Sequence, residues 1–324
     1  MNLQTKKKLT SLFPSIRFNE PLAAHCTFRI GGPADAYIET ADPRPILSAL
    51  KKLKIPFIII GGGSNILFHD KGFRGAVIRL TPRTSTSTSA NVSTNPNASA
   101  IAFTKTSVTA DAGTPLQTLI KKASQKGFYN LAALTGIPGT LGGAIRGNAG
   151  ANGAEIKDFL IKAQIFNPKT GRTRTVTPTV LKLSYRNSAL KRTNEIVLQA
   201  TLKLSKATNY KTLAQKLAKK RTQTQPYGLS AGSFFKNPDP SPNKPHMKAG
   251  YLIDQCGLKG KRIGGAQISS KHANFIQNLN DPHHPATQKD VLRLAALAKK
   301  EVRRRFKITL EEEVQVIPKN NYPT

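Results

Sequence analysis

The sequence predicts a mixed α/β protein of about two domains. Its 324 residues fit two domains at roughly 150 residues each, and 38% of them are hydrophobic, which is enough for a sizeable core. Near the start of the chain, strand, helix and strand patterns follow one another as in a βαβ unit. We place the domain boundary near Lys206, so that residues 1–205 form the first domain and residues 206–324 the second.

In the first domain, hydrophobic spacing predicts alternating strands and helices. Ile46, Leu47, Leu50 and Leu53 recur at helical spacing and predict a helix over 43–53. A second helix, over 114–126, is expected to start with Thr114 as its N-cap and a proline in its first turn. The predicted strands cover residues 37–40, 56–60, 74–80, 107–112, 160–167, 173–177 and 195–204.

The second domain is expected to mix helices with short strands. The predicted helices cover residues 208–225, 249–256 and 287–306, and the predicted strands cover residues 233–236, 262–268, 275–278 and 310–317.

A stretch of Thr, Ser, Asn and Pro over residues 81–99 interrupts the first domain. It contains few large apolar side chains, so it cannot bury enough surface to order itself. We predict a flexible low-complexity insertion here.

The chain is strongly basic, with 50 Lys and Arg against 17 Asp and Glu, a formal net charge of +33. Such a charge is common in nucleic-acid-binding proteins. Here the basic residues are spread through nearly every segment, and tryptophan, which would stack on bases, is absent. We favour a generally basic surface without specific nucleic-acid recognition, and keep nucleic-acid binding as the alternative.

Several other classes of protein are not expected. The longest apolar run, over 55–60, is far too short to span a bilayer, so no membrane insertion is predicted. Cys26 and Cys256 cannot build a disulfide framework, and the pair His283 and His284 lacks accompanying ligands, so no metal site is expected. We expect a cytoplasmic protein with reduced thiols.

Two glycine-rich segments are the strongest local signals. The first, Gly61-Gly62-Gly63-Ser64-Asn65, follows a predicted buried strand, and its backbone N–H groups could hold a pyrophosphate. It is neither a Rossmann fingerprint nor a P-loop, and a tight turn without ligand fits equally well. The second covers residues 136–153 and carries Ile137, Leu141 and Ile145, so a buried loop against a large flat ligand fits better than a linker.

These segments belong to a series of short motifs in a fixed order. The motifs cover residues 19–22, 25–34, 61–65, 136–153, 185–188, 231–238, 249–253, 272–276 and 310–314. Together they resemble the UDP-N-acetylenolpyruvoylglucosamine reductase (MurB) family over nearly the whole chain.

The resemblance implies an α+β fold. Two N-terminal subdomains would hold FAD, as in flavoproteins of the vanillyl-alcohol-oxidase type, and a C-terminal α/β domain would bind substrate. Only a modest stretch separates Tyr185 from Ser233, so the chain resembles the shorter form of the family, which lacks the tyrosine loop.

The resemblance also implies the activity. With non-covalent FAD and NADPH as co-substrate, the family reduces UDP-N-acetylglucosamine enolpyruvate to UDP-N-acetylmuramate for peptidoglycan synthesis. Hydride reaches the vinyl carbon distal to the carboxylate, and the carbon next to the carboxylate then needs a proton. We expect a monomer. The alternatives are another FAD oxidoreductase on the same fold and a basic nucleic-acid-binding protein.

Three residues would carry the chemistry by this resemblance. Ser233 would donate the proton, Arg186 would hold the substrate carboxylate, and Glu313 would help to protonate or polarise it. The substrate's negative charge should raise the pKa of Glu313. If Glu311 and Glu313 share one side of a strand, Glu312 faces the other.

The binding residues are carried over from the same motifs. Those expected to line FAD are Arg29, Gly61, Gly62, Gly63, Ser64, Asn65, Gly136, Gly139, Thr140 and Gly143. Those expected to bind the sugar nucleotide are Tyr185, Lys236 and Asn237. His272 and Asn274 would at most support the site, and Cys26 stands where the family commonly has Thr.

Overall fold

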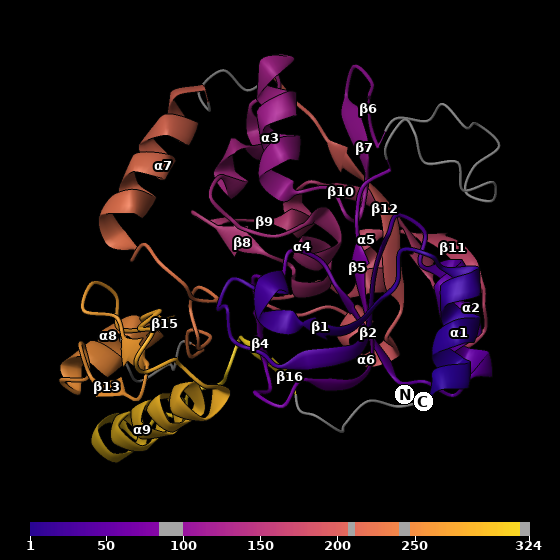
Figure 1. Ribbon diagram of the computed structural model, residues 1–324. Helices are drawn as coiled ribbons and strands as arrows, with labels where there is room; N and C mark the ends of the chain where they lie inside the picture. The colour runs from indigo at the N-terminus through magenta and orange to yellow at the C-terminus, as the bar shows by residue number, and fades with distance from the viewer. Residues whose placement is uncertain (84–99, 207–210, 240–246, 318–324) are drawn as a thin grey trace.

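The computed structural model describes residues 1–83, 100–206, 211–239 and 247–317 (Figure 1). Most of the predicted flexible insertion, residues 84–99, lies outside these ranges, as do the first residues of the helix predicted over 208–225.

A four-stranded sheet near the N-terminus confirms the predicted βαβ start. Its order is β1-β2-β5-β3, with β2, β5 and β3 parallel and β1 antiparallel at the edge. The strands are β1 (Arg17–Pro21), β2 (Pro33–Thr40), β3 (Phe57–Ile60) and β5 (Phe73–Leu80). Helix α2 (Arg44–Lys52) connects β2 to β3 and buries Ile46, Leu47 and Leu50.

Both faces of this sheet are buried. Ile38 and Ile78 belong to a core shared with the rest of the N-terminal part, and Tyr37 and Val77 belong to a core shared with the C-terminal part. A parallel sheet covered on both sides requires nearly continuous apolar strands, and the run Phe57–Ile60 meets this requirement. The sheet is therefore the central layer of the molecule.

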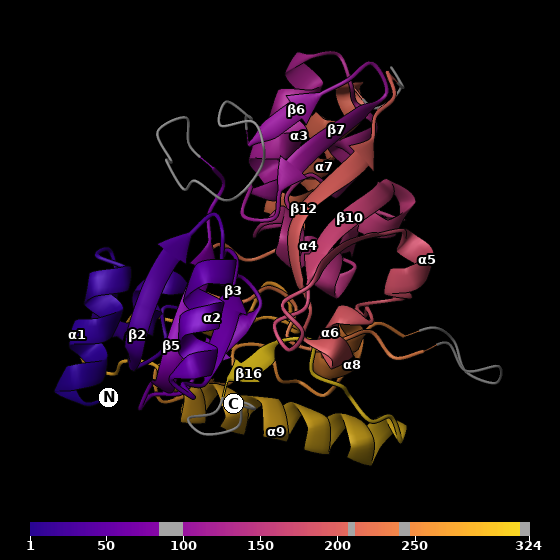
Figure 2. The same ribbon diagram turned by 90° about the vertical axis from the view of Figure 1, so that its right-hand side faces the viewer.

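A five-stranded antiparallel sheet forms the second layer, at the upper right of Figure 2. Its order is β11-β10-β12-β7-β6. The strands are β6 (Ile101–Phe103), β7 (Ser107–Asp111), β10 (Leu160–Phe166), β11 (Thr173–Val176) and β12 (Ile196–Lys203). The four strands predicted in this region are confirmed, whereas β6 was not expected.

Short helices accompany this sheet: α3 (Leu116–Gln125), α4 (Leu141–Gly147), α5 (Pro178–Leu181) and α6 (Leu190–Thr193). The predicted cap of α3 is wrong, because Pro115 takes the N-cap position and Thr114 makes no capping bond. Helix α4 was not expected in a glycine-rich passage. Its Leu141 and Ile145 are fully buried, as their apolar character predicted.

The C-terminal part contains a small antiparallel sheet, β13-β14-β15, in contact with the long helix α9. Its elements are α7 (Lys211–Thr224), α8 (Ala249–Gln255), β13 (Arg262–Ile263), β14 (Ala266–Ile268), β15 (Ile276–Asn278) and α9 (Gln288–Phe306). The single strand predicted over 262–268 is wrong, because Gly264 (φ +53°) turns it into a hairpin. Helix α9 begins with a capping box between Thr287 and Asp290.

The last described segment returns to the N-terminal part. Strand β16 (Gln315–Ile317) pairs in parallel with β4 (Ile66–Phe68), directly after the first glycine loop. The strand predicted over 310–317 is therefore correct only at its end. The strand predicted over 233–236 is wrong, since isolated bridges from Ser233 to Phe275 and from Phe235 to Glu312 replace it.

Several short elements have no counterpart in the sequence-based prediction. They are α1 (Leu3–Leu12), β8 (Gly150–Ala151), β9 (Ala154–Glu155) and the 3₁₀ helices Leu22–His25, Asn130–Leu134 and Ile156–Asp158. Helix α1 buries only Leu9, so its sequence carries little hydrophobic pattern.

The boundary predicted near Lys206 stays a prediction. It falls between β12 and α7, yet β16 pairs with β4 across it. Within the described ranges, no helix combines the length and apolarity needed to cross a membrane.

Candidate active site

The two glycine-rich segments lie against each other so closely that side chains would not fit. A Cβ on Gly61 would lie 2.2 Å from Thr140 Oγ1, and a Cβ on Gly62 would lie 2.8 Å from Gly139 Cα. A Cβ on Gly139, at φ +98°, would lie 2.8 Å from Ser64 Oγ. Glycine is therefore required at these positions by the contact itself.

The segment 25–29 packs against the first glycine loop, and the three segments together are called the cradle below. The Thr27 amide donates to the Gly63 carbonyl at 3.1 Å. Gly63 has φ +62°, and a Cβ there would lie 2.1 Å from the His25 carbonyl oxygen. Arg29 is exposed, and its guanidinium donates to the Ala24 carbonyl at 3.2 Å.

Buried polar atoms without partners gather around the same loops. Thr27 Oγ1, Thr114 Oγ1, Thr135 Oγ1 and His25 Nδ1 have no hydrogen-bond partner among the described residues. Each of these residues lies beside a glycine loop. His25 and Thr27 belong to the segment 25–29, the Thr114 carbonyl accepts from the Leu141 amide, and Thr135 directly precedes Gly136. An unsatisfied buried polar group costs about 1–3 kcal/mol. The cradle therefore fits a bound polar group, and its half-buried glycine backbone, which lacks side chains, can lie close to a dinucleotide.

The other predicted cofactor residues have protein contacts in this structure. The Gly136 amide donates to Gln117 Oε1 at 2.9 Å, and Gly143 has room for a Cβ, whose nearest neighbour would be 3.6 Å away. The Asn65 side chain donates to the Glu313 carbonyl at 3.0 Å. Their contacts with FAD stay predictions, and Asn65 additionally ties the loop to the C-terminal segment.

Arg221 of α7 is a residue that no sequence motif marked. Its side chain covers Gly136, where a Cβ would lie 2.6 Å from Arg221 Cδ. Burial lowers the pKa of this guanidinium. Because the contact joins residues 85 positions apart, no local pattern could have indicated it.

Arg186 and Glu313 form an ion pair, with 2.7 Å between Nε and Oε1. The side chains are only 22% and 19% exposed. Arg186 Nη2 also donates to the Gly150 carbonyl at 3.1 Å, and its guanidinium carbon lies 5.1 Å from the centre of the Tyr185 ring. The structure thus joins two of the three predicted catalytic residues directly.

The segment carrying Ser233 lies beside Glu313. The Glu313 amide donates to the Phe234 carbonyl at 2.8 Å. Asn274 holds the next residue from both sides, since its side chain accepts from the Phe235 amide at 2.9 Å and donates to the Phe235 carbonyl at 2.8 Å. The backbone after Ser233 is therefore fixed, and Asn274 has the supporting position that the sequence suggested.

Burial has the largest effect on the pKa of Glu313. It raises the pKa of the carboxyl group, although Arg186, Lys191 and Lys236 act in the opposite direction. The rise expected from the negative charge of a substrate stays a prediction, because the cause in this structure is burial.

The three consecutive glutamates alternate as predicted. Glu311 pairs with Lys236 at 2.9 Å, on the side of Arg186 and Glu313. Glu312 points to the other side and pairs with Lys299 of α9 at 2.6 Å. Only Glu313 is therefore available to the site as a buried acid.

The residues predicted to bind substrate lie next to this pair. The Tyr185 hydroxyl accepts from the Asn237 amide at 3.2 Å. The Asn237 side chain accepts from the Ala249 amide at the start of α8, so it also fixes that helix. His272 supports the fold, because its ring lies against Gly250 and packs on Phe275. Substrate contacts of Tyr185, Lys236 and Asn237 stay predictions.

Cys26 belongs to the core shared with the C-terminal part. Its thiol is buried and donates to the Ile30 carbonyl at 3.3 Å, and burial raises its pKa. A thiol in place of the usual threonine is therefore an interior change.

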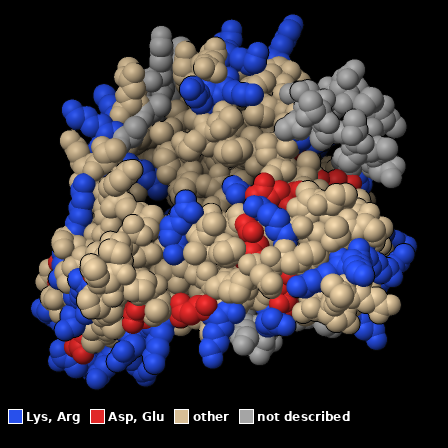
Figure 3. All heavy atoms as spheres, in the orientation of Figure 1, with Lys and Arg blue, Asp and Glu red and all other residues tan. Residues whose placement is uncertain are grey.

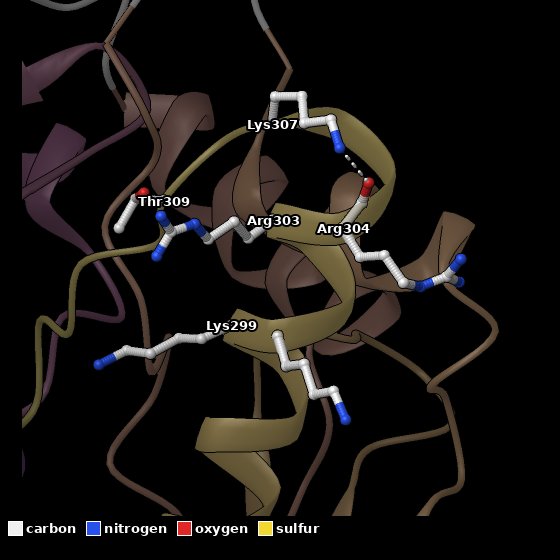
Figure 4. Close-up of a pocket in the computed structure, with 6 residues that line it drawn as sticks. Lys299, Arg303, Arg304, Lys307 and Thr309 are labelled. Atoms are coloured by element: carbon white, nitrogen blue, oxygen red, sulfur yellow. Dashed lines mark hydrogen bonds between the residues drawn. The ribbon is translucent and has the colours of Figure 1, made fainter.

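A basic hollow on α9 is separate from this site. It is lined by Lys299, Lys300, Arg303, Arg304, Lys307 and Thr309 (Figure 4). The labelled side chains point in different directions, and Lys307 Nζ donates to the Arg304 carbonyl at 3.3 Å. Cations in the last turns of a helix are favoured by its dipole. The hollow is thus the solvated side of α9.

Comparison with known proteins places this site in a family. The FAD binding domain model matches residues 39–177, and the model of the C-terminal domain of UDP-N-acetylenolpyruvoylglucosamine reductase matches residues 224–317. A relative from Alkaliphilus oremlandii (strain OhILAs), named UDP-N-acetylenolpyruvoylglucosamine reductase, is 38% identical over 97% of this chain and 98% of its own length. The chain belongs to the UDP-N-acetylenolpyruvoylglucosamine reductase (MurB) family.

Further relatives agree with membership of the MurB family. The protein of the same name from Bacillus subtilis (strain 168) is 36% identical over 93% of this chain and 94% of its own length. The crystal structure of MurB from Thermus caldophilus is 30% identical, has a TM-score of 0.71, and covers 94% of this chain and 98% of that one. The expected fold, an FAD-binding domain followed by a MurB C-terminal domain, is confirmed, and FAD is the cofactor of this family.

Proposed function

We propose that this protein is an NADPH-dependent flavoenzyme of peptidoglycan precursor synthesis. It reduces UDP-N-acetylglucosamine enolpyruvate to UDP-N-acetylmuramate. The observation that carries this proposal is the half-buried Arg186–Glu313 pair beside the Ser233 segment, which suits a substrate with a carboxylate next to a reactive carbon. Membership of the MurB family supports it.

The connection between the two glycine loops and the acid supports the same reaction. Asn65 donates through its side chain to the Glu313 carbonyl at 3.0 Å and accepts from the Gln315 amide at 3.0 Å. Two hydrogen bonds thus join the first glycine loop to the segment that carries the acid. Such a connection keeps reacting groups in register, which is a main source of catalytic rate.

FAD, when bound, accepts hydride from NADPH and supplies it to the vinyl carbon distal to the carboxylate. Negative charge then develops on the carbon next to the carboxylate. The Ser233 hydroxyl protonates this carbon. A serine is a weak acid, but a carbanion-like centre within reach is basic enough to take its proton.

Arg186 and Glu313 bind the substrate carboxylate. A guanidinium matches the two carboxylate oxygens, and Arg186 already holds one carboxylate, that of Glu313. Because burial raises the pKa of Glu313, the acid can be protonated beside a second anion and donate a hydrogen bond to it. Both groups stabilise charge that develops in the transition state.

The change Ser233→Ala tests the proton donor. We expect flavin reduction by NADPH to stay close to wild type. Flavin reoxidation by the enolpyruvyl sugar nucleotide should slow by about 10²–10³, the usual cost of losing a group aimed at developing charge. Both steps are measured by anaerobic stopped-flow absorbance.

Ser270→Ala is the matched control, since Ser270 is an exposed serine of the same part of the chain. It should change neither step. Equal slowing of both steps in Ser233→Ala would show that Ser233 is not the proton donor. Reoxidation by a different class of acceptor, and not by the sugar nucleotide, would favour another FAD oxidoreductase.

We also propose that the protein acts as a monomer in the cytoplasm. Cys26 and Cys256 are unpaired in the structure, which is typical of a reducing compartment. Light scattering coupled to size-exclusion chromatography tests the monomer.

A further inference from the structure

A half-buried lysine contacts the backbone of the arginine in the proposed active site. Lys191, in α6, donates from Nζ to the carbonyl oxygen of Arg186 at 2.7 Å. The Lys191 side chain is half-buried, and its own amide donates to the Ser188 carbonyl at 3.2 Å. The sequence motif that marks Arg186, over residues 185–188, does not include this lysine.

The backbone of Arg186 needs such a support. Its φ is +53°, in the left-handed region that is unfavourable for any residue with a Cβ. Ser184 and Asn187 bond to each other across it, at 3.2 Å and 3.0 Å, which makes a tight turn. A strained conformation of this kind persists only where its surroundings hold it, and it is commonly part of a functional site.

The lysine itself is anchored by a neighbouring network. Arg146 of α4 donates to the Leu190 carbonyl at 2.6 Å, and the Ser188 hydroxyl donates to the Arg146 carbonyl at 2.6 Å. These bonds tie α6 to α4, which begins directly after Thr140 of the cradle. The position of Lys191 is therefore set by the same helix that borders the predicted cofactor loops.

Burying a cation at this place is unfavourable by itself. Burial lowers the pKa of Lys191, and the nearby charges of Lys236, Arg146 and Arg186 lower it further, while Glu313 alone acts the other way. The cations gathered beside the half-buried Glu313 repel one another in the free protein, and their charge favours a bound anion.

We propose that Lys191 is a positioning residue that holds Arg186 in its left-handed turn and adds positive charge beside it, so that the site prefers a ligand bearing a carboxylate. This inference rests on the proposed function, because it assigns the carboxylate of that substrate to Arg186. Lys191 itself acts through the Arg186 carbonyl.

Binding of two ligands to the oxidised, FAD-loaded protein tests this. UDP-N-acetylmuramate carries the carboxylate, and UDP-N-acetylglucosamine lacks it. Lys191→Met should weaken binding of the first by roughly 10- to 100-fold, the scale of a misplaced binding group, and leave the second within about threefold. Lys191→Arg, which restores a cation and a donor, should recover most of the loss. Binding is followed by the change in flavin absorbance.

Arg192→Met is the matched control, because Arg192 is the exposed neighbour of Lys191 in α6. It should bind both ligands as wild type does. Equal weakening of both ligands in Lys191→Met, or no weakening, would overturn the positioning role. A third result would also overturn it: Lys191→Met loses FAD while Lys191→Arg keeps it in full, and the preference for the carboxylate ligand is unchanged. If wild type shows no preference for the carboxylate ligand, the proposed function fails first.

Discussion

Glu313 is a residue of the candidate site whose acidity the fold changes. Burial favours its neutral form, and the ion pair with Arg186 favours its carboxylate. Burial prevails, so the pKa of the folded state lies above the ordinary value. A carboxyl group with a raised pKa beside an arginine takes up a proton more readily when a second carboxylate binds.

This balance predicts how stability depends on pH. Since the folded pKa of Glu313 is raised, its contribution is fully present below pH 4.5 and is lost as the pH rises through the folded value. The unfolding free energy of wild type minus that of Glu313→Gln should therefore fall with increasing pH. Urea denaturation of both proteins without substrate, between about pH 4 and pH 8, measures it.

Glu311→Gln provides a control of opposite sign. Lys236 lowers the pKa of Glu311, so the contribution of Glu311 is present above the ordinary value and lost as the pH falls. This side chain is 72% exposed, so its effect should be small. An advantage of wild type over Glu313→Gln that grows with pH would mean that the Arg186 ion pair outweighs burial.

Single residues could be selected from the sequence only where a motif marks them. Ser233, Arg186 and Glu313 stand in short motifs, and the structure brings their segments together. Lys191 and Arg221 could not be selected, because their meaning lies in contacts with a carbonyl and a glycine elsewhere in the fold.

At the scale of elements, the two glycine loops depend on each other. Gly61→Ala would place a Cβ 2.2 Å from Thr140 Oγ1, so one loop must move. Such overpacking costs about 1–3 kcal/mol. We expect roughly 10- to 100-fold weaker FAD binding with secondary structure retained. Reconstitution of apoprotein with FAD, followed by fluorescence quenching, measures the affinity.

Gly147→Ala is the matched control in the same glycine-rich passage. Nothing lies within 4 Å of a Cβ at Gly147, so FAD affinity should stay unchanged. Unaltered affinity in Gly61→Ala would show that the contact between the loops is not needed to hold the cofactor.

Elements with a clear hydrophobic pattern were predictable from the sequence, whereas elements held mainly by tertiary contacts were not. Apolar runs such as Phe57–Ile60 marked their strands correctly. The segments 233–236 and 310–314 carry strand-like residues, but Asn274 and isolated bridges hold them instead of a ladder. Helix α4 was missed because Gly142 and Gly143 are poor helix formers.

On the scale of the whole molecule, positive charge is spread over the surface. Figure 3 shows Lys and Arg in scattered groups over the visible face, many of them toward its rim, with Asp and Glu in a few places. This distribution resembles a general basic surface more than a dedicated nucleic-acid-binding patch, and a field of this kind attracts phosphorylated ligands.

The Thr/Ser-rich insertion should be dispensable to the whole molecule. The chain is anchored on both sides of it, because Arg83 binds Asp111 at 2.6 Å and Ile101 pairs with Ala110. Deleting residues 86–97 shortens a connection, which changes the free energy of unfolding by less than about 1 kcal/mol. Thermal unfolding and FAD content should both stay near wild type. Loss of FAD would show that the insertion is structural.

The order of the domains could be predicted from the sequence, but the return of the C-terminal segment to the N-terminal part could not. Strands β4 and β16 pair in parallel although they lie about 250 positions apart, and each strand has only three residues. Elements so short carry no periodic signal. This pairing brings Glu313 to the cofactor loop through Asn65.

The visible absorption spectrum of the purified protein tests the central claim most directly. It is recorded before and after anaerobic NADPH, and again after UDP-N-acetylglucosamine enolpyruvate is added. The account predicts a yellow protein that NADPH bleaches and that regains its colour with the sugar nucleotide. A protein that stays bleached with this sugar nucleotide, or that cannot be reconstituted with FAD, would contradict it.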